Sequence, residues 1–202
     1  MSTSHTHRSR RVLLVAAAAA AFLTIAVPRA DAQVIPPAVP ANLEVQAGNT
    51  PFLIGHADGS QNYICLLSES GFQWTFFGPQ ATLLDDHDQQ VITHFLSANP
   101  DENGMLRATW QHSEDSSAIW AAAIANSTDS SFVAAPAIPW LLLRVVGAEE
   151  GPTSGSTLSA TTFVQRVNTT GGLAPTTGCR RADDIGRKAF VPYTADYVFY
   201  SH

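Results

Sequence analysis

The chain has 202 residues, 45% of them hydrophobic, with a formal net charge of −6 and only two cysteines. This length suits one domain, or at most two small ones, and the apolar content is enough to bury a core. Residues 1–32 contain four arginines and one aspartate, so their removal changes the formal charge from −6 to −9. Such an acidic chain lacks the basic surface that binds the phosphates of a nucleic acid, and we expect no nucleic acid partner.

The first 32 residues have the pattern of a cleaved signal peptide. Basic residues in the segment 8–11 (RSRR) precede a mostly apolar, alanine-rich run over 12–27, and Ala-Asp-Ala at 30–32 is a small-x-small cleavage signal. Pro28 and Arg29 end the apolar run before the roughly 20 residues that a membrane span needs. We therefore expect an exported protein, periplasmic or secreted, with no membrane span after cleavage.

The export route is left open by the sequence. Residues 9–14 (SRRVLL) resemble a twin-arginine signal, which would direct export of an already folded protein. Paired arginines also occur in leaders of the general route, which exports unfolded chains. Both routes agree with the pattern.

After the leader, we expect a proline-rich N-terminal arm over 33–42 and a single β domain over 43–202. Turn signals such as Gly48-Asn49, Asp58-Gly59 and Gly78-Pro79 divide the domain into short segments rich in β-branched and aromatic residues. The predicted strands are 43–45, 51–56, 61–67, 72–77, 81–84, 91–96, 106–112, 118–124, 138–146, 157–168 and 195–200. Roughly ten strands without alternating long helices predict an all-β fold, an antiparallel β-sandwich or barrel.

The two cysteines, Cys65 and Cys179, can form only one intramolecular bond. In an oxidising compartment we expect this disulfide to form. The alternatives are two buried free thiols or a catalytic cysteine, and no motif places an activating base for the second.

The densest group of candidate metal ligands lies in a predicted hairpin and consists of Asp85, Asp86 and His87, with His94 on the following strand. Carboxylate oxygens on a tight loop suit calcium, and a histidine favours a transition metal. Aspartates are also common in hairpin turns, where they bind their own backbone. A further arrangement would bring three strand histidines together at zinc: His56, His94 and His112.

No catalytic motif is present, and we expect no cofactor. Gly-x-Ser-x-Gly does not occur, because Thr153 stands at the nucleophile position in 151–155. No Gly-x-Gly-x-x-Gly loop follows a strand, so a nicotinamide cofactor is not indicated. We therefore assign no catalytic residues.

Four tryptophans on predicted strands are candidate ligand-binding residues: Trp74, Trp110, Trp120 and Trp140. Exposed indoles in a row would form a stacking platform for a sugar, whereas buried indoles would belong to the core. If residues 113–117 form a turn, Trp110 and Trp120 lie opposite each other on one face of a hairpin.

Several sequence blocks resemble a known family. They are Gly59-x-Gln61-x-Tyr63-x-Cys65, Ile138-Pro139-Trp140-Leu141-Leu142, Gln165-Arg166-Val167-Asn168-Thr169-x-Gly171-Gly172 with Cys179, and Val191-Pro192-Tyr193-x-Ala195-Asp196-Tyr197. Together they resemble a secreted domain-of-unknown-function family of bacteria and fungi, in which some fungal members carry a malate dehydrogenase label. The resemblance implies a compact exported domain with paired cysteines and supplies no catalytic residues.

These observations favour a non-catalytic exported β domain that binds an extracellular or periplasmic ligand, with carbohydrate as one candidate. A second hypothesis is a metal-dependent or His/Asp hydrolase that uses the hairpin over 85–94. A third is a structural envelope protein without a small ligand.

Overall fold

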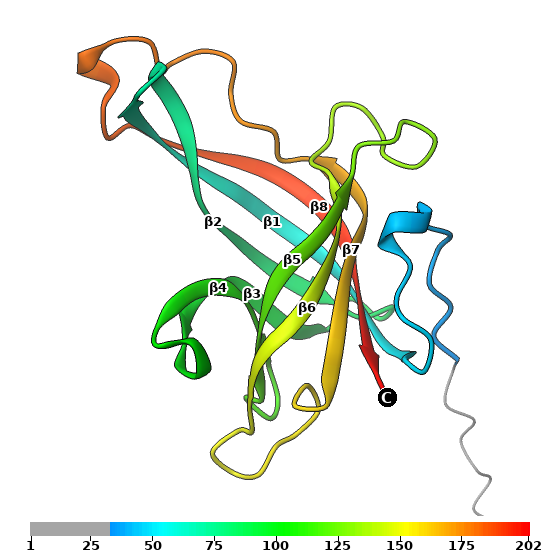
Figure 1. The fold of residues 1–202 in the computed structure, drawn as a ribbon. Helices are drawn as coiled ribbons and strands as arrows, with labels where there is room; N and C mark the ends of the chain where they lie inside the picture. The colour runs from blue at the N-terminus through cyan, green and yellow to red at the C-terminus, as the bar shows by residue number, and fades with distance from the viewer. Residues whose placement is uncertain (1–32) are drawn as a thin grey trace, which may run out of the picture. The chain divides into compact units, whose positions relative to one another are not determined.

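The structure is a computed structural model that describes residues 33–202, so the predicted signal peptide lies outside the described residues. Eight antiparallel strands form a closed barrel, in which each strand pairs with the next and β8 pairs with β1 (Figure 1). The strands are β1 (Thr50–Ser68), β2 (Gly71–Leu84), β3 (Gln90–Asn99), β4 (Met105–His112), β5 (Ala118–Ser127), β6 (Trp140–Glu149), β7 (Thr161–Gly171) and β8 (Lys188–Ser201). The three 3-10 helices described are η1 (Ala41–Leu43), η2 (Pro100–Glu102) and η3 (Ala182–Asp184). The predicted all-β antiparallel fold is confirmed, in its barrel form.

The barrel has eight strands, close to the roughly ten expected, because two predicted turns lie inside strands. Gly59 continues β1 and pairs with Ala81 of β2. A Cβ atom at Gly59 would lie 2.2 Å from the carbonyl oxygen of Gln80, so glycine is needed for the close approach of β2. Gly78-Pro79 likewise lies within β2, next to a β-bulge in which β2 has one residue more than β1. Glycine thus serves strand packing at these two positions.

The interior of the barrel holds the larger hydrophobic core. Its most deeply buried members come from six strands: Leu83, Ile92, Trp110, Ile119, Val164 and Phe199. Full burial of such a side chain contributes about 1.5–3 kcal/mol. This core holds the strands in register around the space described below.

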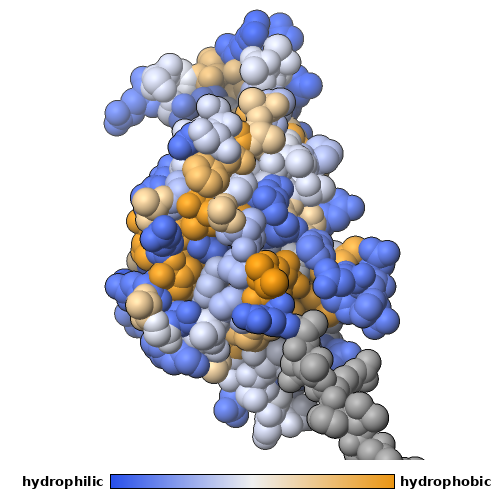
Figure 2. All heavy atoms as spheres, turned by 90° about the vertical axis from the view of Figure 1, so that its right-hand side faces the viewer, coloured by the Kyte–Doolittle hydropathy of each residue, from blue (hydrophilic) through white to orange (hydrophobic). Residues whose placement is uncertain are grey.

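A second apolar cluster lies outside the barrel, where the N-terminal arm packs against β6, β7 and β8. Val34 and Val39 of the arm and Leu43 of η1 contact outward-facing side chains that include Trp140. Gln165 Nε2 donates a hydrogen bond to the Leu43 carbonyl oxygen at 2.7 Å. Residues 41–43 form η1 instead of the start of the predicted strand 43–45. Figure 2 views this side and shows apolar groups as separate patches among polar ones.

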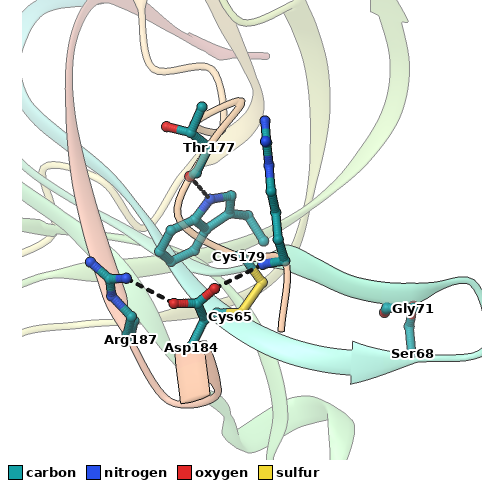
Figure 3. Close-up of a disulfide and its surroundings, with 9 residues drawn as sticks. Cys65, Ser68, Gly71, Thr177, Cys179, Asp184 and Arg187 are labelled. Atoms are coloured by element: carbon teal, nitrogen blue, oxygen red, sulfur yellow. Dashed lines mark hydrogen bonds and ion pairs between the residues drawn. A yellow bond between two sulfur atoms is a disulfide. The ribbon is translucent and has the colours of Figure 1, made fainter. Parts of the chain in front are cut away.

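The disulfide joins Cys65 of β1 to Cys179 in the connection between β7 and β8, across 114 residues (Figure 3). This confirms the predicted pairing. The same connection is held by Trp74, whose Nε1 donates to the Thr177 carbonyl oxygen at 2.8 Å. Arg187 Nη1 donates to Asp184 Oδ1 at 2.8 Å beside the disulfide. The bond therefore fastens an irregular segment to the extended end of β1 and β2.

Candidate functional site

The barrel contains a cavity of about 210 Å³ that is bordered by side chains from all eight strands. Its walls are mainly apolar and include Phe76, Leu96, Leu106, Leu141 and Leu143. Alanines at 108 and 121–123 leave space that larger side chains would fill. Because a cavity of about 150 Å³ holds a molecule the size of benzene, this one can hold a somewhat larger compact organic molecule.

Incomplete strand pairing opens the cavity to the surface. β2 pairs with β3 only over Ala81–Leu84, and β4 pairs with β5 only from Ala108 to Gln111. The hairpin of β3 and β4 therefore separates from both neighbours and bends away from the barrel (Figure 1). Phe76 and Leu106, which border the cavity here, are 45% and 66% exposed. The cavity thus has an apolar rim.

Arg166 of β7 brings an unbalanced positive charge to the cavity. Its Nη2 donates to the Pro139 carbonyl oxygen at 2.8 Å, while its buried Nε has no hydrogen-bond partner among the described residues. No described aspartate or glutamate borders the cavity, and none of the ion pairs found within residues 33–202 includes Arg166. The second arginine at the cavity, Arg107, donates two hydrogen bonds of 2.7 Å to Glu102. This pairing lowers the pKa of Glu102 to about 2, so the charge of Arg107 is balanced.

Two further donors in the cavity wall have no partner among the described residues. Gln61 of β1 is 3% exposed, and its Nε2 is buried without a hydrogen bond. Trp110 of β4 is fully buried, and its indole Nε1 is likewise unpaired. A buried donor without a partner costs about 1–3 kcal/mol, so such groups are uncommon and ask for an explanation.

His94 of β3 contributes an uncharged ring to the same wall. Its Nδ1 donates to the Thr109 carbonyl oxygen at 2.8 Å, which leaves Nε2 as an acceptor. The ring stacks on Trp110 with 4.3 Å between centroids and 10° between planes. Burial lowers the pKa of His94 to about 3, and the nearby charge of Arg166 acts in the same direction. At neutral pH, His94 therefore adds no charge to the cavity.

Two buried tyrosines of β8 complete the polar part of the interior. The hydroxyl groups of Tyr193 and Tyr197 lie 3.2 Å apart, and Tyr197 borders the cavity. Burial raises the pKa of both phenols, against the opposing effect of the Arg166 charge. Both stay protonated at neutral pH, so Arg166 remains the unbalanced charge.

The four tryptophans lie in four different surroundings. Trp110 borders the cavity, and Trp140 packs in the outer cluster beneath the arm. Trp120 is 6% exposed and donates from Nε1 to Ser97 Oγ at 2.8 Å, while Trp74 lies beside the disulfide. The four indoles therefore do not form an exposed row, and only Trp110 belongs to the cavity.

The predicted pairing of Trp110 with Trp120 is wrong by one residue. Trp110 pairs with Ile119, and Trp120 pairs with Thr109. The turn over 113–117 closes with a hydrogen bond from the His112 nitrogen to the Ser117 oxygen, which fixes this register. A shift of one residue places two side chains on opposite faces of a sheet. Trp110 therefore faces the interior and Trp120 the exterior.

The candidate metal ligands of the β2–β3 hairpin do not come together. Asp85 Oδ1 accepts backbone hydrogen bonds from His87 and Gln89, each at 2.9 Å, and these bonds lower the pKa of Asp85. Asp86 contacts His56, whereas His94 lies inside the barrel. Within residues 33–202 there is no group of three or more His, Cys, Asp and Glu side chains suited to a metal. Asp85 thus has the turn-forming role considered above.

The three strand histidines are likewise separate. His94 is inside the barrel, and His112 lies at the end of β4 with Nδ1 at 3.3 Å from Asp115. His56 lies on β1 between two carboxylates, with Nδ1 at 2.7 Å from Asp196 and Nε2 at 3.0 Å from Asp86. The structure therefore forms no three-histidine zinc site from these residues.

His56 is expected to titrate above its ordinary pKa of 6.5. The hydrogen bond to Asp196 raises its pKa most, partial burial opposes this, and Asp86 adds a smaller increase. Because the folded pKa is raised, the stabilisation is fully present below the unfolded pKa and is lost as pH rises through the folded value. An NMR titration of the His56 ring should show this shift.

Variants of the two carboxylates provide the control for this titration. Asp196→Asn should lower the pKa of His56 more than Asp86→Asn, since Asp196 makes the shorter contact and is less exposed. A wild-type pKa at or below 6.5 would contradict the prediction.

Gln61 and Arg166 were not among the site residues predicted from the sequence. Both lie in strands that are otherwise mostly apolar: Arg166 shares the inward face of β7 with Val164, and Gln61 comes shortly before Tyr63 and Cys65. A long polar side chain at an inward position was the available signal. Its meaning depends on which strands surround it, which the pattern does not give.

The fold and the cavity define a class of protein, a closed eight-stranded antiparallel barrel with one disulfide and an internal cavity of ligand size. The family model described as "Protein of unknown function (DUF3455)" matches residues 46–201, and the chain belongs to this family. The resemblance to a domain-of-unknown-function family is thereby confirmed. No curated protein and no solved structure matches the chain. Among the described residues, no helix is long and apolar enough to cross a membrane.

Proposed function

We propose that this protein binds one small, mainly apolar molecule inside its barrel and does not catalyse a reaction. The observation that supports this most directly is the cavity bordered by all eight strands. Interiors of eight-stranded barrels are filled by side chains or hold one small ligand, and here the alanines at 121–123 favour the second. Apolar walls with a few directed polar groups are typical of ligand sites.

We further propose that the protein is exported and binds its ligand in the periplasm or outside the cell. The leader pattern over 1–32 supports export by the general or the twin-arginine route. The Cys65–Cys179 disulfide also supports it, because such bonds persist in oxidising compartments.

The cavity favours this function over the other hypotheses. A carbohydrate platform would need exposed indoles, whereas Trp110, Trp120 and Trp140 are at most 6% exposed. A hydrolase at the 85–94 hairpin would need Asp85 and His94 at one place, but Asp85 lies in the turn between β2 and β3 and His94 is buried inside the barrel. No specific observation within residues 33–202 favours a structural envelope role.

Binding to the cavity can be tested with 1-aminonaphthalene, an uncharged, mainly apolar dye whose two fused rings are somewhat larger than benzene. We expect the mature protein to bind one dye molecule with increased and blue-shifted fluorescence. Ala123 borders the cavity and is itself exposed, so Ala123→Trp should narrow the cavity without disturbing the core. This variant is expected to weaken dye binding at least tenfold.

The matched control is Ala148→Trp, because Ala148 is an exposed strand alanine away from the cavity. Its dye affinity should stay within twofold of the wild type, and circular dichroism should show that both variants are folded. Equal binding by the two variants, or several dye molecules per chain, would show that the dye occupies outer apolar patches and would refute the proposal.

A further inference from the structure

We propose that the molecule held in the barrel carries a carboxylate, and that Arg166, Gln61 and Trp110 bind this head group. This inference rests on the proposed function, because it names the chemical class of the same ligand. The hydrogen-bonding groups that border the cavity are mostly donors.

The three donors have unused capacity at one cavity. Gln61 Nε2, Trp110 Nε1 and Arg166 Nε are each buried without a partner in the described part of the chain, and all three residues border the cavity. Trp110 is fully buried and Gln61 is 3% exposed, so bulk water does not reach them freely. Donors in such surroundings are stabilised by a ligand that supplies oxygen acceptors.

The charges around the cavity indicate that the head group of the ligand is an anion. The guanidinium of Arg166 donates to the Pro139 carbonyl oxygen and lies close to the Tyr197 hydroxyl, while its buried Nε has no partner among the described residues. No described carboxylate borders the cavity. His94 is uncharged at neutral pH because burial lowers its pKa, and Tyr193 and Tyr197 are uncharged because burial raises theirs. An anionic head would therefore supply the missing counter-charge.

A carboxylate fits better than a phosphate. A phosphate monoester carries about 1.5–2 negative charges near neutral pH, more than one guanidinium balances. A carboxylate carries one charge and has two oxygens that match the planar guanidinium. The apolar walls formed by leucines and by Phe76 then suit a hydrocarbon or aromatic body that extends toward the rim. The inferred class is an amphipathic monocarboxylic acid.

Matched probes that differ only in the head group test the inference. We propose calorimetric titration of the mature protein at pH 7 with octanoate, 1-octanol, octylamine and octyl phosphate. Octanoate should bind at least tenfold more tightly than 1-octanol, since a charge-assisted hydrogen bond is about twice as strong as a neutral one. Octylamine should bind more weakly than 1-octanol, and octyl phosphate more weakly than octanoate.

Variants identify the residues that cause the preference. Arg166→Met should abolish the difference in affinity between octanoate and 1-octanol. Arg144→Met is the matched control, because Arg144 is an exposed arginine on the neighbouring strand β6 and should retain the preference. Gln61→Leu removes one donor, leaves the Pro139 contact of Arg166 in place, and should weaken octanoate binding at least threefold.

The outcomes separate the two proposals. Equal affinity of the wild type for octanoate and 1-octanol, or an unchanged preference in Arg166→Met, would overturn the carboxylate while 1-aminonaphthalene binding still supported the cavity. Tighter binding of octyl phosphate would overturn the choice of carboxylate over phosphate. Failure of 1-aminonaphthalene and of all four probes to bind would refute the proposed function, and this inference with it.

Discussion

Replacement of both cysteines by serine is expected to lower the free energy of unfolding by about 2–5 kcal/mol. The bond spans 114 residues, and in the chain-entropy model closing a loop of about 100 residues contributes about 4.7 kcal/mol. Backbone hydrogen bonds also hold the junction, from the Cys65 nitrogen to the Arg187 oxygen and from the Gly186 nitrogen to the Cys65 oxygen. The barrel should therefore still fold in the Cys65→Ser/Cys179→Ser variant, with a lower urea midpoint.

Reduction of the wild-type protein provides the control for this measurement. A reducing agent should move the wild-type midpoint close to that of the double variant and leave the double variant unchanged. Identical midpoints for oxidised wild type and double variant would show that the tether does not contribute to stability.

Trp110→Ala is expected to lower the free energy of unfolding by about 3–5 kcal/mol. The indole is fully buried, stacks on His94 and meets the edges of Tyr197 and Phe199 with centroids at 5.5 and 6.2 Å. Its removal enlarges an existing cavity, so neighbouring side chains cannot refill the space easily. Because the substitution also removes the unpaired Nε1 donor, we expect a loss in the lower half of this range. Chemical denaturation monitored by circular dichroism would measure it.

Two further variants show whether burial causes this loss. Trp110→Phe keeps an aromatic ring and should lose less than half as much stability as Trp110→Ala. Phe190→Ala removes an aromatic side chain that is 61% exposed and should change the free energy of unfolding by no more than about 0.5 kcal/mol. A similar loss in Phe190→Ala and Trp110→Ala would contradict the central position of Trp110 in the core.

Local patterns predicted the fold class and the disulfide correctly, because alternating strands and a single pair of cysteines leave few alternatives. They failed where glycine had two explanations. Gly59 looks like a turn residue in the sequence, yet it lies in β1 where the backbone of β2 approaches too closely for a side chain. Only the neighbouring strand distinguishes the two roles, and that neighbour is defined by the tertiary fold.

The candidate site was harder to predict from the sequence, because the tertiary fold decides which residues come together. Trp110 was predicted as one of four indoles that could stack on a sugar, but its inward direction depends on a register that the hydrogen bonds of the 113–117 turn set. Arg166 and Gln61 lie more than a hundred positions apart and meet only because the barrel closes. The histidines and aspartates were candidate metal ligands because of their chemistry. In the structure Asp85 shapes a turn, and His94 is a buried neutral ring.

The pairing of β1 with β8 has a consequence for biogenesis. β1 pairs with β8 from Thr50 to Ile64, so the backbone hydrogen-bonding groups on this edge of the first strand have no partner until the last strand has been synthesised. A nascent chain therefore cannot close the barrel until the whole domain has been synthesised.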